Sequence, residues 1–443
     1  MPLWLRALIR FVLGIWFRSV EIVGAQNSPR AGPLLVVANH ENGLLDPMLV
    51  AGYLPLAPRF LGKSTLWKIP VLWPFLVAAR VLPVQRKQDQ GEGADMSKNA
   101  EMFQKVADAL NAGAVISLFP EGESHNEPGM LPLKTGAARM CLSGPVETKF
   151  LPVGIAFENK HRFRGRALLV VGEVFDPAPL RTPGADPRAV SHAITDAVAA
   201  ALKKVTINLP TWEDRKLLER AVEISRADDE SLEARVRHLK NFAEAWEALR
   251  VSHPEEVARL RAQVARYDRE LRLLRMSDED VRARYRPISV ANWTLRFVRL
   301  FLLRLPMGVL GAVLHAIPYQ IPRAIAKAKA EEADQPASYK LMAGFVIYPV
   351  WWLLLAAVAF LLRGAEIAAG VLVLAPISAW VALRWMEQGF TLGEQARSWF
   401  LRGRRAALLE EMRAQRAEIA AGIGALEKTW RASGASRQGA TTA

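Results

Sequence analysis

The sequence predicts an α/β domain with a mixed sheet flanked by helices, followed by a helical region and a C-terminal transmembrane helical hairpin. Between about residues 32 and 178, short apolar runs alternate with amphipathic helical patterns, as they do in α/β domains. Over residues 211–290, Glu, Arg, Leu and Ala recur at helical spacing. Two long apolar segments follow, at about 341–362 and 367–384.

The composition is both apolar and basic. Of the 443 residues, 51% are hydrophobic, and the mean hydropathy is +0.09. The 58 Lys and Arg residues outnumber the 44 Asp and Glu residues, which gives a net charge of +14. Together these properties favour a membrane with anionic headgroups over nucleic acid as the partner. The single cysteine, Cys141, excludes an intramolecular disulfide and suits a reducing compartment.

Residues 1–30 are expected to form an interfacial amphipathic helix. Three arginines lie among Leu, Ile, Phe and Trp residues between Leu3 and Val23. The apolar run from Phe11 to Phe17 is too short to span a bilayer, and no small-residue cleavage site clearly follows it. A helix that lies in the membrane interface is therefore favoured over a signal peptide or a span.

The α/β domain is expected to occupy residues 31–210. The amphipathic stretch Ser97–Ala112 predicts a helix that stops at Gly113, and a second helix over Ser191–Lys204 closes the domain. Apolar runs predict strands at residues 34–38, 59–62, 81–84, 115–119, 150–156 and 167–172.

The rest of the chain is predicted to be helical. Residues 211–290 are expected to form a charged helical hairpin with a solvated face, broken at Ser252-His253-Pro254. The membrane region, residues 291–385, contains the two predicted spans and an interfacial or re-entrant segment at 295–319, whose arginines leave its apolar remainder too short to span. An amphipathic helix is expected at 386–432 and a disordered tail at 433–443.

The charges around the two spans predict their orientation. Lys327, Lys329 and Lys340 precede the pair and several arginines follow it, whereas the short link between the spans holds Arg363 and Glu366. Because cytoplasmic flanks carry the excess of Lys and Arg, both flanks are expected in the cytoplasm. The sequence thus predicts an integral membrane protein whose α/β domain is on the cytoplasmic side.

The stretch NHENGLLDP, residues 39–47, holds the first candidate catalytic pair. His40 follows a buried strand and Asp46 comes six positions later, which makes them a candidate general base and its orienting carboxylate. Since six positions turn a straight helix through about 600°, at least one of the two must lie in a loop. The alternative interpretation is an ordinary helix start, with Asp46 as N-cap and Pro47 at the first helical position.

Further candidates follow other strands. The run VISLFPEG places Glu121 at a sheet edge, where substrates of α/β domains commonly bind; the alternative is an ordinary turn after a strand. Gly62-Lys63-Ser64-Thr65 does not complete a phosphate loop, because Ala57 stands where its first glycine belongs. The candidate phosphate contacts are the cations Lys63, Lys68, Arg80, Arg86 and Lys134. The alternative interpretation is that each of them is an ordinary surface charge.

Four motifs in order resemble those of the glycerophospholipid acyltransferase superfamily (PlsC-like). They are NHENGLLDP, GKSTLWKIP leading to RVLPVQR, LFPEGESHNEPGMLPLKTGAA, and FLPVGI, and together they cover about residues 30–180. Most of that superfamily has four residues between the His and the Asp, whereas five intervene here, and the third motif continues as GESHNEP rather than with Thr-Arg. In both respects the chain is closest to the fungal-type glycerol-3-phosphate/dihydroxyacetone-phosphate acyltransferases.

The resemblance implies transfer of a fatty acyl group from acyl-CoA or acyl-carrier protein to glycerol 3-phosphate or dihydroxyacetone phosphate, in phospholipid biosynthesis. It implies that His40 is the base and Asp46 its orienting partner, with neither a metal nor a cofactor. A helix N-terminus near Asp46 or Gly122 is expected to stabilise developing negative charge. The substrate-binding residues that the motifs imply are Arg86, Glu121 and Gly122, with Pro152 on the acyl-donor side and Lys63, Lys68, Ser124 and Lys134 as further contacts.

Two alternatives to this function remain at the level of sequence. In the first alternative, the acceptor is lysophosphatidic acid or another lysophospholipid, because the shared motifs indicate the reaction better than they indicate the acceptor. Alternatively, the chain is a membrane scaffold without activity, against which the intact His40, Asp46 and Glu121 argue.

Overall fold

The computed structural model describes residues 1–84, 97–182, 184–225, 231–274, 276–282, 292–295, 297–298, 308–404 and 406–433. The chain divides into two compact units. The sheet unit comprises Met1–Arg215, Asp228–Ala243 and Glu331–Ser338. The helical unit comprises Lys216–Ala227, Glu244–Ala330 and Tyr339–Ala443.

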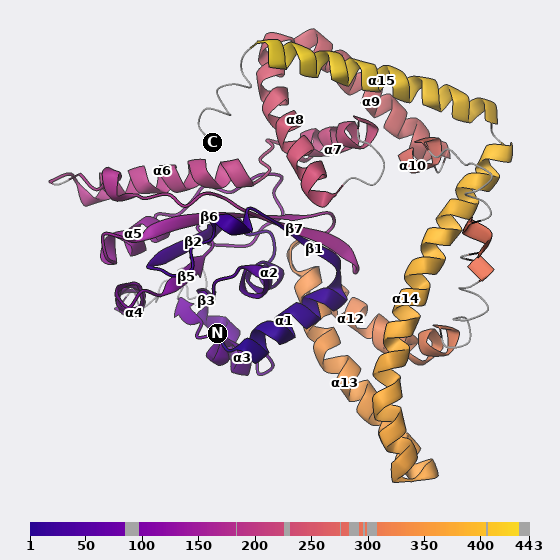
Figure 1. Ribbon diagram of the computed structural model, residues 1–443, viewed down its shortest axis with the longest axis horizontal. Coiled ribbons are helices and arrows are strands. Elements are labelled where there is room, and N and C mark those ends of the chain that lie inside the picture. The colour runs from indigo at the N-terminus through magenta and orange to yellow at the C-terminus, as the bar shows by residue number, and fades with distance from the viewer. Residues whose placement is uncertain are drawn as a thin grey trace. The chain divides into compact units, whose positions relative to one another are not determined.

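The sheet unit contains a seven-stranded mixed sheet with the order β1-β7-β6-β2-β5-β3-β4 (Figure 1). Every neighbouring pair is parallel except β6 and β7. All five residues of the central strand β2 are buried, because a parallel sheet is covered on both faces. The strands are β1 (Phe17–Val23), β2 (Leu34–Ala38), β3 (Arg59–Lys63), β4 (Leu82–Val84), β5 (Val115–Leu118), β6 (Lys149–Phe157) and β7 (Gly165–Val171).

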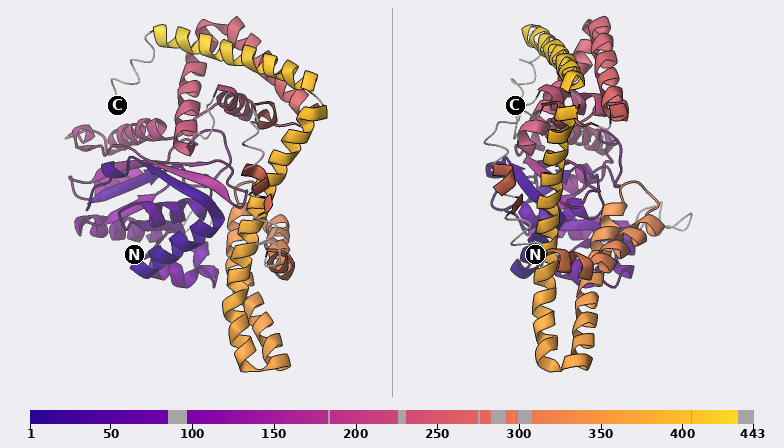
Figure 2. Two further views of the ribbon diagram at one scale, coloured as in Figure 1. Left: turned by 45° about the vertical axis from the view of Figure 1, so that its right-hand side comes forward. Right: turned by 90° about the vertical axis from the view of Figure 1, so that its right-hand side faces the viewer.

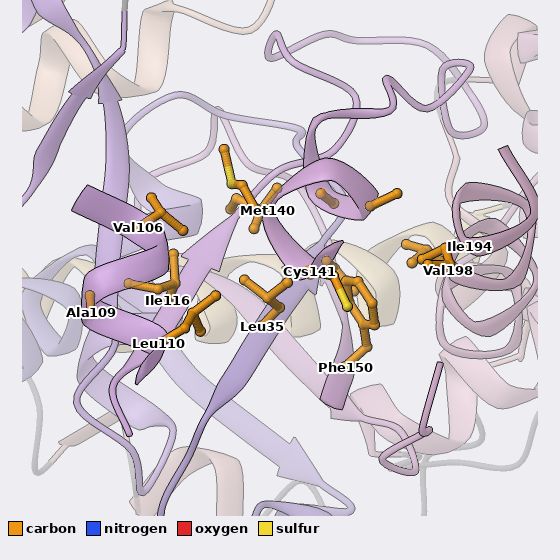
Figure 3. Packing of buried hydrophobic residues seen from close by; sticks show 14 of the residues in the cluster. Leu35, Val106, Ala109, Leu110, Ile116, Met140, Cys141, Phe150, Ile194 and Val198 are labelled. Carbon is orange, nitrogen blue, oxygen red and sulfur yellow. The ribbon is translucent and has the colours of Figure 1, made fainter. Parts of the chain in front are cut away.

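Helices cover both faces of this sheet. The helices α1 (Leu3–Trp16) and α2 (Leu45–Tyr53) lie on one face, and α4 (Ser97–Asn111), α5 (Gly136–Ser143) and α6 (Pro187–Val205) lie on the other (Figure 1). The short helix α3 (Trp73–Ala78) precedes β4. On the second face, side chains such as Leu35, Ile116 and Phe150 pack against those of α4, α5 and α6 and form one apolar core (Figure 3).

All six predicted strands are present, with ends that differ by at most two residues from those expected. The single helix predicted over residues 1–30 is wrong after Trp16, because Phe17–Val23 form β1 and pair with β7. The reason lies far along the chain. The Arg164 guanidinium donates to the carbonyl oxygens of Gly14, Ile15 and Phe17, and so satisfies groups that are left open where the helix ends.

The helices after residue 211 agree with the predicted helical region. The predicted break at Ser252-His253-Pro254 is confirmed, since α8 ends at Ser252 and α9 begins at Pro254. In the helical unit, the Tyr267 hydroxyl and the Arg416 guanidinium both donate to Oδ1 of Asp278, at 2.8 and 3.0 Å, and thereby join three helices. The helices are α7 (Trp212–Ser225), α8 (Leu232–Ser252), α9 (Pro254–Leu274), α10 (Asp278–Arg282), α12 (Ala316–Lys329), α13 (Pro336–Arg363), α14 (Ala365–Arg404) and α15 (Ala406–Ala432).

Within the described part of the chain, two helices are long and apolar enough to cross a membrane, as the sequence predicts. They are Pro336–Arg363, and Ala365–Gly389 within α14, and only 6% and 17% of their most apolar windows are buried. The two helices lie side by side and are joined at Gly364, whose φ of +88° favours glycine (Figure 2). Of the predicted interfacial segment 295–319, residues 296 and 299–307 lie outside the described residues, as do residues 434–443 of the predicted tail.

Gly154 in β6 lies where the end of α6 comes close to the sheet. A Cβ atom there would lie 1.9 Å from the carbonyl oxygen of Val205, the last residue of α6. Because α6 would have to move off the sheet, we expect Gly154→Ala to lower the free energy of unfolding by about 1–3 kcal/mol. Thermal unfolding of the full chain in detergent measures this change.

Gly136→Ala is the matched control. Gly136 is the first residue of α5, and no atom lies within 4 Å of its added Cβ. We expect this variant to be unchanged or to gain up to about 1 kcal/mol, since alanine favours a helix. Equal unfolding temperatures for Gly154→Ala and the wild type would contradict the packing of α6 on β6.

Candidate active site

The candidate site begins where β2 ends at the carboxyl edge of the sheet. Asn39 fixes this point, because its side chain donates to the carbonyl oxygen of Ile155 at 3.0 Å and accepts from the N–H of Ile155 at 2.7 Å. These two bonds tie the end of β2 to its neighbour β6. His40 therefore leaves the sheet from a fixed position, and its side chain is buried.

His40 and Asp46 form the predicted pair. The His40 Nδ1 and Asp46 Oδ2 atoms are 3.0 Å apart, and the Asp46 side chain is completely buried. His40 lies in a loop and Asp46 in the first turn of α2, which meets the requirement that one of them lie outside a helix. The His40 ring also stacks on Phe119, with ring centroids 4.0 Å apart and planes 10° apart. The imidazole is thus held by Asp46 at Nδ1 and by Phe119 against its ring.

The alternative interpretation of Asp46 as an ordinary N-cap is wrong. The helix α2 begins at Leu45, and its N-cap residue, Leu44, makes no side-chain cap bond. Asn42 takes the capping role instead, because its Oδ1 atom accepts from the N–H groups of Leu44 and Leu45 at 3.1 and 2.8 Å. The Asp46 carboxylate is therefore left to face His40.

Glu121 ties the loop after β5 to the loop after β2. Its side chain is 1% exposed. Oε1 accepts from the N–H of His40 at 2.8 Å, and Oε2 accepts from the N–H of Leu131 at 2.6 Å. Oε2 also accepts from Nε2 of His125, at 2.5 Å. The chain does turn here, but the turn directs a buried carboxylate at the backbone of His40.

Gly122 and Lys134 lie against each other beside Glu121. Gly122 has a φ of +82°, and a Cβ there would come within 2.9 Å of the Cδ, Cε and Nζ atoms of Lys134. The backbone N–H of Lys134 donates to the carbonyl oxygen of Pro120 at 2.8 Å, which fixes the backbone of Lys134 beside the third motif. The expected helix N-terminus near Gly122 is absent from the described residues, since the chain turns there and the next helix begins at Gly136.

The other predicted residues lie in several different strands and loops. The Ser124 Oγ atom lies 3.4 Å from the Cβ position of Gly43, which is between His40 and Asp46 in the chain. Lys63 ends β3, and it lies at the carboxyl edge of the sheet because β3, β5 and β2 are parallel. Lys68 ends the 3-10 turn that follows β3. Pro152 is buried in β6, opposite Val37. Arg86 lies outside the described residues.

Lys160 is a site residue that the sequence analysis missed. The residue is 6% exposed, and its ammonium donates to the carbonyl oxygens of Glu41 and His125, at 2.6 and 3.2 Å. It thus joins the loop that carries the His40–Asp46 pair to the loop that carries Glu121. Lys160 lies between charged residues in a turn after β6, where no sequence pattern separates it from a surface lysine. His125 was also missed, although it lies within the third motif.

Burial dominates the electrostatics of the site. Burial raises the pKa of Asp46, whose Oδ1 atom has no hydrogen-bond partner within the described part of the chain, while the N–H of Asn42 and the charge of Lys160 oppose this rise. Burial likewise raises the pKa of Glu41 and lowers that of Lys160. Among the described residues, no three His, Cys, Asp or Glu side chains gather as metal ligands would.

The charge of His125 gives a pH-dependent prediction. Burial lowers the pKa of His125, but the hydrogen bond to Glu121 and the charges of Glu121 and Glu41 outweigh burial, so the pKa is raised above its ordinary value of 6.5. Protonated His125 therefore stabilises the fold fully below pH 6.5, and this contribution is lost as the pH rises through the raised pKa.

His125→Gln tests this effect, because glutamine keeps a donor for Glu121 but carries no charge. We expect the unfolding temperature of the variant to fall furthest below that of the wild type at about pH 6, with a smaller difference at about pH 9. A difference that stays constant between these pH values would contradict the charged interaction.

Comparisons with known proteins find similar sequences among acyltransferases. Residues 19–156 match the family model described as Acyltransferase, and residues 226–431 match the one described as Glycerol-3-phosphate acyltransferase 2 C-terminal domain. An uncharacterized acyltransferase of Schizosaccharomyces pombe is 30% identical over 287 residues, which are 58% of this chain and 39% of the relative. Glycerol-3-phosphate O-acyltransferase 2 of Saccharomyces cerevisiae is 32% identical over 121 residues, which are 26% of this chain and 16% of the relative.

Among solved structures, the 1-acyl-sn-glycerophosphate (LPA) acyltransferase PlsC from Thermotoga maritima aligns with a TM-score of 0.33 and 22% identity, over 44% of this chain and 77% of that one. The matched part of this chain covers well under half the length of the two curated yeast relatives. Its two matched regions follow each other in order, and the first contains His40, Asp46 and Glu121. Residues 19–156 are thus similar to the Acyltransferase family, and residues 226–431 are similar to the C-terminal domain of glycerol-3-phosphate acyltransferase 2.

Proposed function

We propose that the chain transfers a fatty acyl group from a thioester donor, acyl-CoA or acyl-carrier protein, to the hydroxyl of glycerol 3-phosphate or dihydroxyacetone phosphate. The observation that carries this proposal is the buried contact of 3.0 Å between His40 Nδ1 and Asp46 Oδ2. The C-terminal match, to a domain named for a glycerol-3-phosphate acyltransferase, favours a glycerol phosphate over a lysolipid as acceptor. The S. cerevisiae relative carries the same activity in its name.

The geometry supports a direct transfer with His40 as general base. With Nδ1–H donating to Asp46, the Nε2 atom of His40 takes the proton of the acceptor hydroxyl while that oxygen attacks the thioester carbonyl carbon. The tetrahedral intermediate then collapses, the carbon–sulfur bond breaks, and the imidazolium returns its proton to the leaving thiolate. The Asp46 carboxylate stabilises the imidazolium between these two steps. Each cycle consumes one thioester and one alcohol and yields one ester and one thiol.

Cations near His40 supply the contact for the acceptor phosphate in this proposal. No arginine follows Phe-Pro-Glu-Gly here, and the Lys134 ammonium lies against Gly122 at that place instead. Lys63 lies at the same edge of the sheet. We assign the phosphate to Lys134 first, with Lys63 and Arg86 as further contacts and Pro152 on the acyl-donor side. The active site faces the cytoplasm, and the reaction uses no cofactor.

Loss of the base is the first test of this function. In membranes that contain the full chain and labelled acyl donor, we expect His40→Ala to reduce acylation of glycerol 3-phosphate by about a hundredfold or more, because no group then takes the hydroxyl proton. Dihydroxyacetone phosphate and lysophosphatidic acid are supplied separately. Faster incorporation into lysophosphatidic acid than into either glycerol phosphate would contradict the proposed acceptor, and no incorporation into any of the three would refute the enzyme.

Loss of the proposed phosphate contact is the second test. We expect Lys134→Met to raise the KM for glycerol 3-phosphate by about tenfold with little change in kcat, because a charge-assisted bond to the phosphate is removed. Lys149→Met makes the same change in an exposed lysine at the start of β6, at the opposite edge of the sheet, and serves as the control. A KM for Lys134→Met that equals that of the control would remove Lys134 from the phosphate site.

A further inference from the structure

A segment from far along the chain reaches the loop between His40 and Asp46. Residues Glu331–Ser338 belong to the sheet unit, although they are about 290 residues away in sequence. The Asn42 Nδ2 atom donates to the carbonyl oxygen of Asp334 at 2.6 Å, and the Ser338 Oγ atom donates to Asn42 Oδ1 at 2.9 Å. We refer to Glu331–Ser338 as the strap.

The strap leads directly into the membrane. Pro336 is the first residue of α13, the first of the two helices that are long and apolar enough to span a bilayer. The strap is nevertheless packed within the sheet unit, since Asp334 is 2% exposed and Ala337 is completely buried. The chain is therefore held against the loop between His40 and Asp46 at the point where α13 begins.

Asn42 connects the strap to the carboxylate that orients the base. The Asn42 N–H donates to Oδ2 of Asp46 at 2.7 Å, the same oxygen that contacts His40. The Asn42 side chain meanwhile bonds both to the strap and to the first N–H groups of α2, the helix that carries Asp46. Asn42 is completely buried, so water does not replace a bond that is lost. A displacement of the strap would therefore reach both Asp46 and its helix.

The charge of Asp334 in the strap also acts on Lys160, the buried cation between the two loops of the site. The negative charges of Glu41, Asp46 and Asp334 all favour the protonated form of Lys160, against the burial that lowers its pKa. Lys160 in turn holds the carbonyl oxygens of Glu41 and His125. The strap thus bonds the loop after β2 through Asn42, and its Asp334 adds negative charge that favours protonated Lys160.

We infer that Asn42 is a positioning residue through which the strap Glu331–Ser338, the segment that leads into the membrane, sets the orientation of the His40–Asp46 pair. This inference rests on the proposed function, because it concerns the base of that reaction. It predicts that loosening the strap slows the chemical step and leaves acceptor binding intact. The proposed phosphate contact is made by other residues, chiefly Lys134, which the strap does not touch through any bond described above.

The experiment uses the full chain reconstituted in lipid nanodiscs. Ser338→Ala removes the hydroxyl that donates to Asn42, and we expect kcat to fall about five- to tenfold while the KM for glycerol 3-phosphate stays within about twofold of wild type. Ser338→Thr keeps the hydroxyl and is expected to restore most of kcat. Ser143→Ala is the matched control, because the Ser143 hydroxyl is exposed and bonds the carbonyl oxygen of Arg139 in its own helix.

Asn42→Asp tests the other strap bond, because an aspartate keeps the acceptor for Leu44, Leu45 and Ser338 but has no N–H for the carbonyl of Asp334. We expect a larger loss of kcat than for Ser338→Ala. If this variant fails to fold, the Ser338 series alone decides the inference.

Hydrogen exchange provides a readout that needs no substrate. Because Asn42 protects the N–H groups of Leu44 and Leu45, we expect faster exchange at residues 42–46 in Ser338→Ala and no change in Ser143→Ala. Wild-type kcat and wild-type exchange in Ser338→Ala would overturn the inference, as would a raised KM with an unchanged kcat. An inactive wild-type chain would instead refute the proposed function, while exchange would still report the contact between the strap and Asn42.

Discussion

The geometry of this site depends on the buried carboxylate of Glu121. A buried carboxylate is costly unless it is hydrogen-bonded or paired with positive charge, and Glu121 has such partners in two different loops. It accepts from the backbone of His40 on one side and from Leu131 and His125 on the other. Because parallel strands deliver both loops to the same edge of the sheet, a single side chain fixes the base relative to the third motif. Lys160 repeats this connection with the opposite charge.

How much the sequence predicts depends on the range of the interactions involved. Buried strands are visible as apolar runs, and the motifs place His40 and Glu121 in the loops after β2 and β5, where they are found. Asp46 is paired with His40 as expected. The first strand was missed because Arg164, about 150 residues away, terminates α1. Lys160 and the strap were missed for the same reason: their role arises from contacts between distant segments, and neither has a local pattern. Arg86 remains a prediction.

The five-residue spacing between His40 and Asp46 has a structural counterpart. Asn42 lies within it, caps α2 in place of Asp46, and donates its N–H to the carboxylate. Asn42 thus caps the helix and Asp46 orients His40, so neither side chain has to do both. The same Asn42 bonds the segment that precedes the first membrane helix. The five-residue spacing therefore contains the residue through which distant parts of the chain meet.

The central claim is that Asp46 holds His40 as a base with Nδ1 protonated. The most direct measurement is the single-turnover rate of acyl transfer to glycerol 3-phosphate by Asp46→Asn in the full chain, beside its KM. An asparagine fits the same space, but it neither stabilises the imidazolium nor enforces this tautomer. The account predicts a rate that is lower by roughly a hundredfold or more with an unchanged KM. A rate within a few-fold of wild type would show that the His40–Asp46 contact does not orient the base.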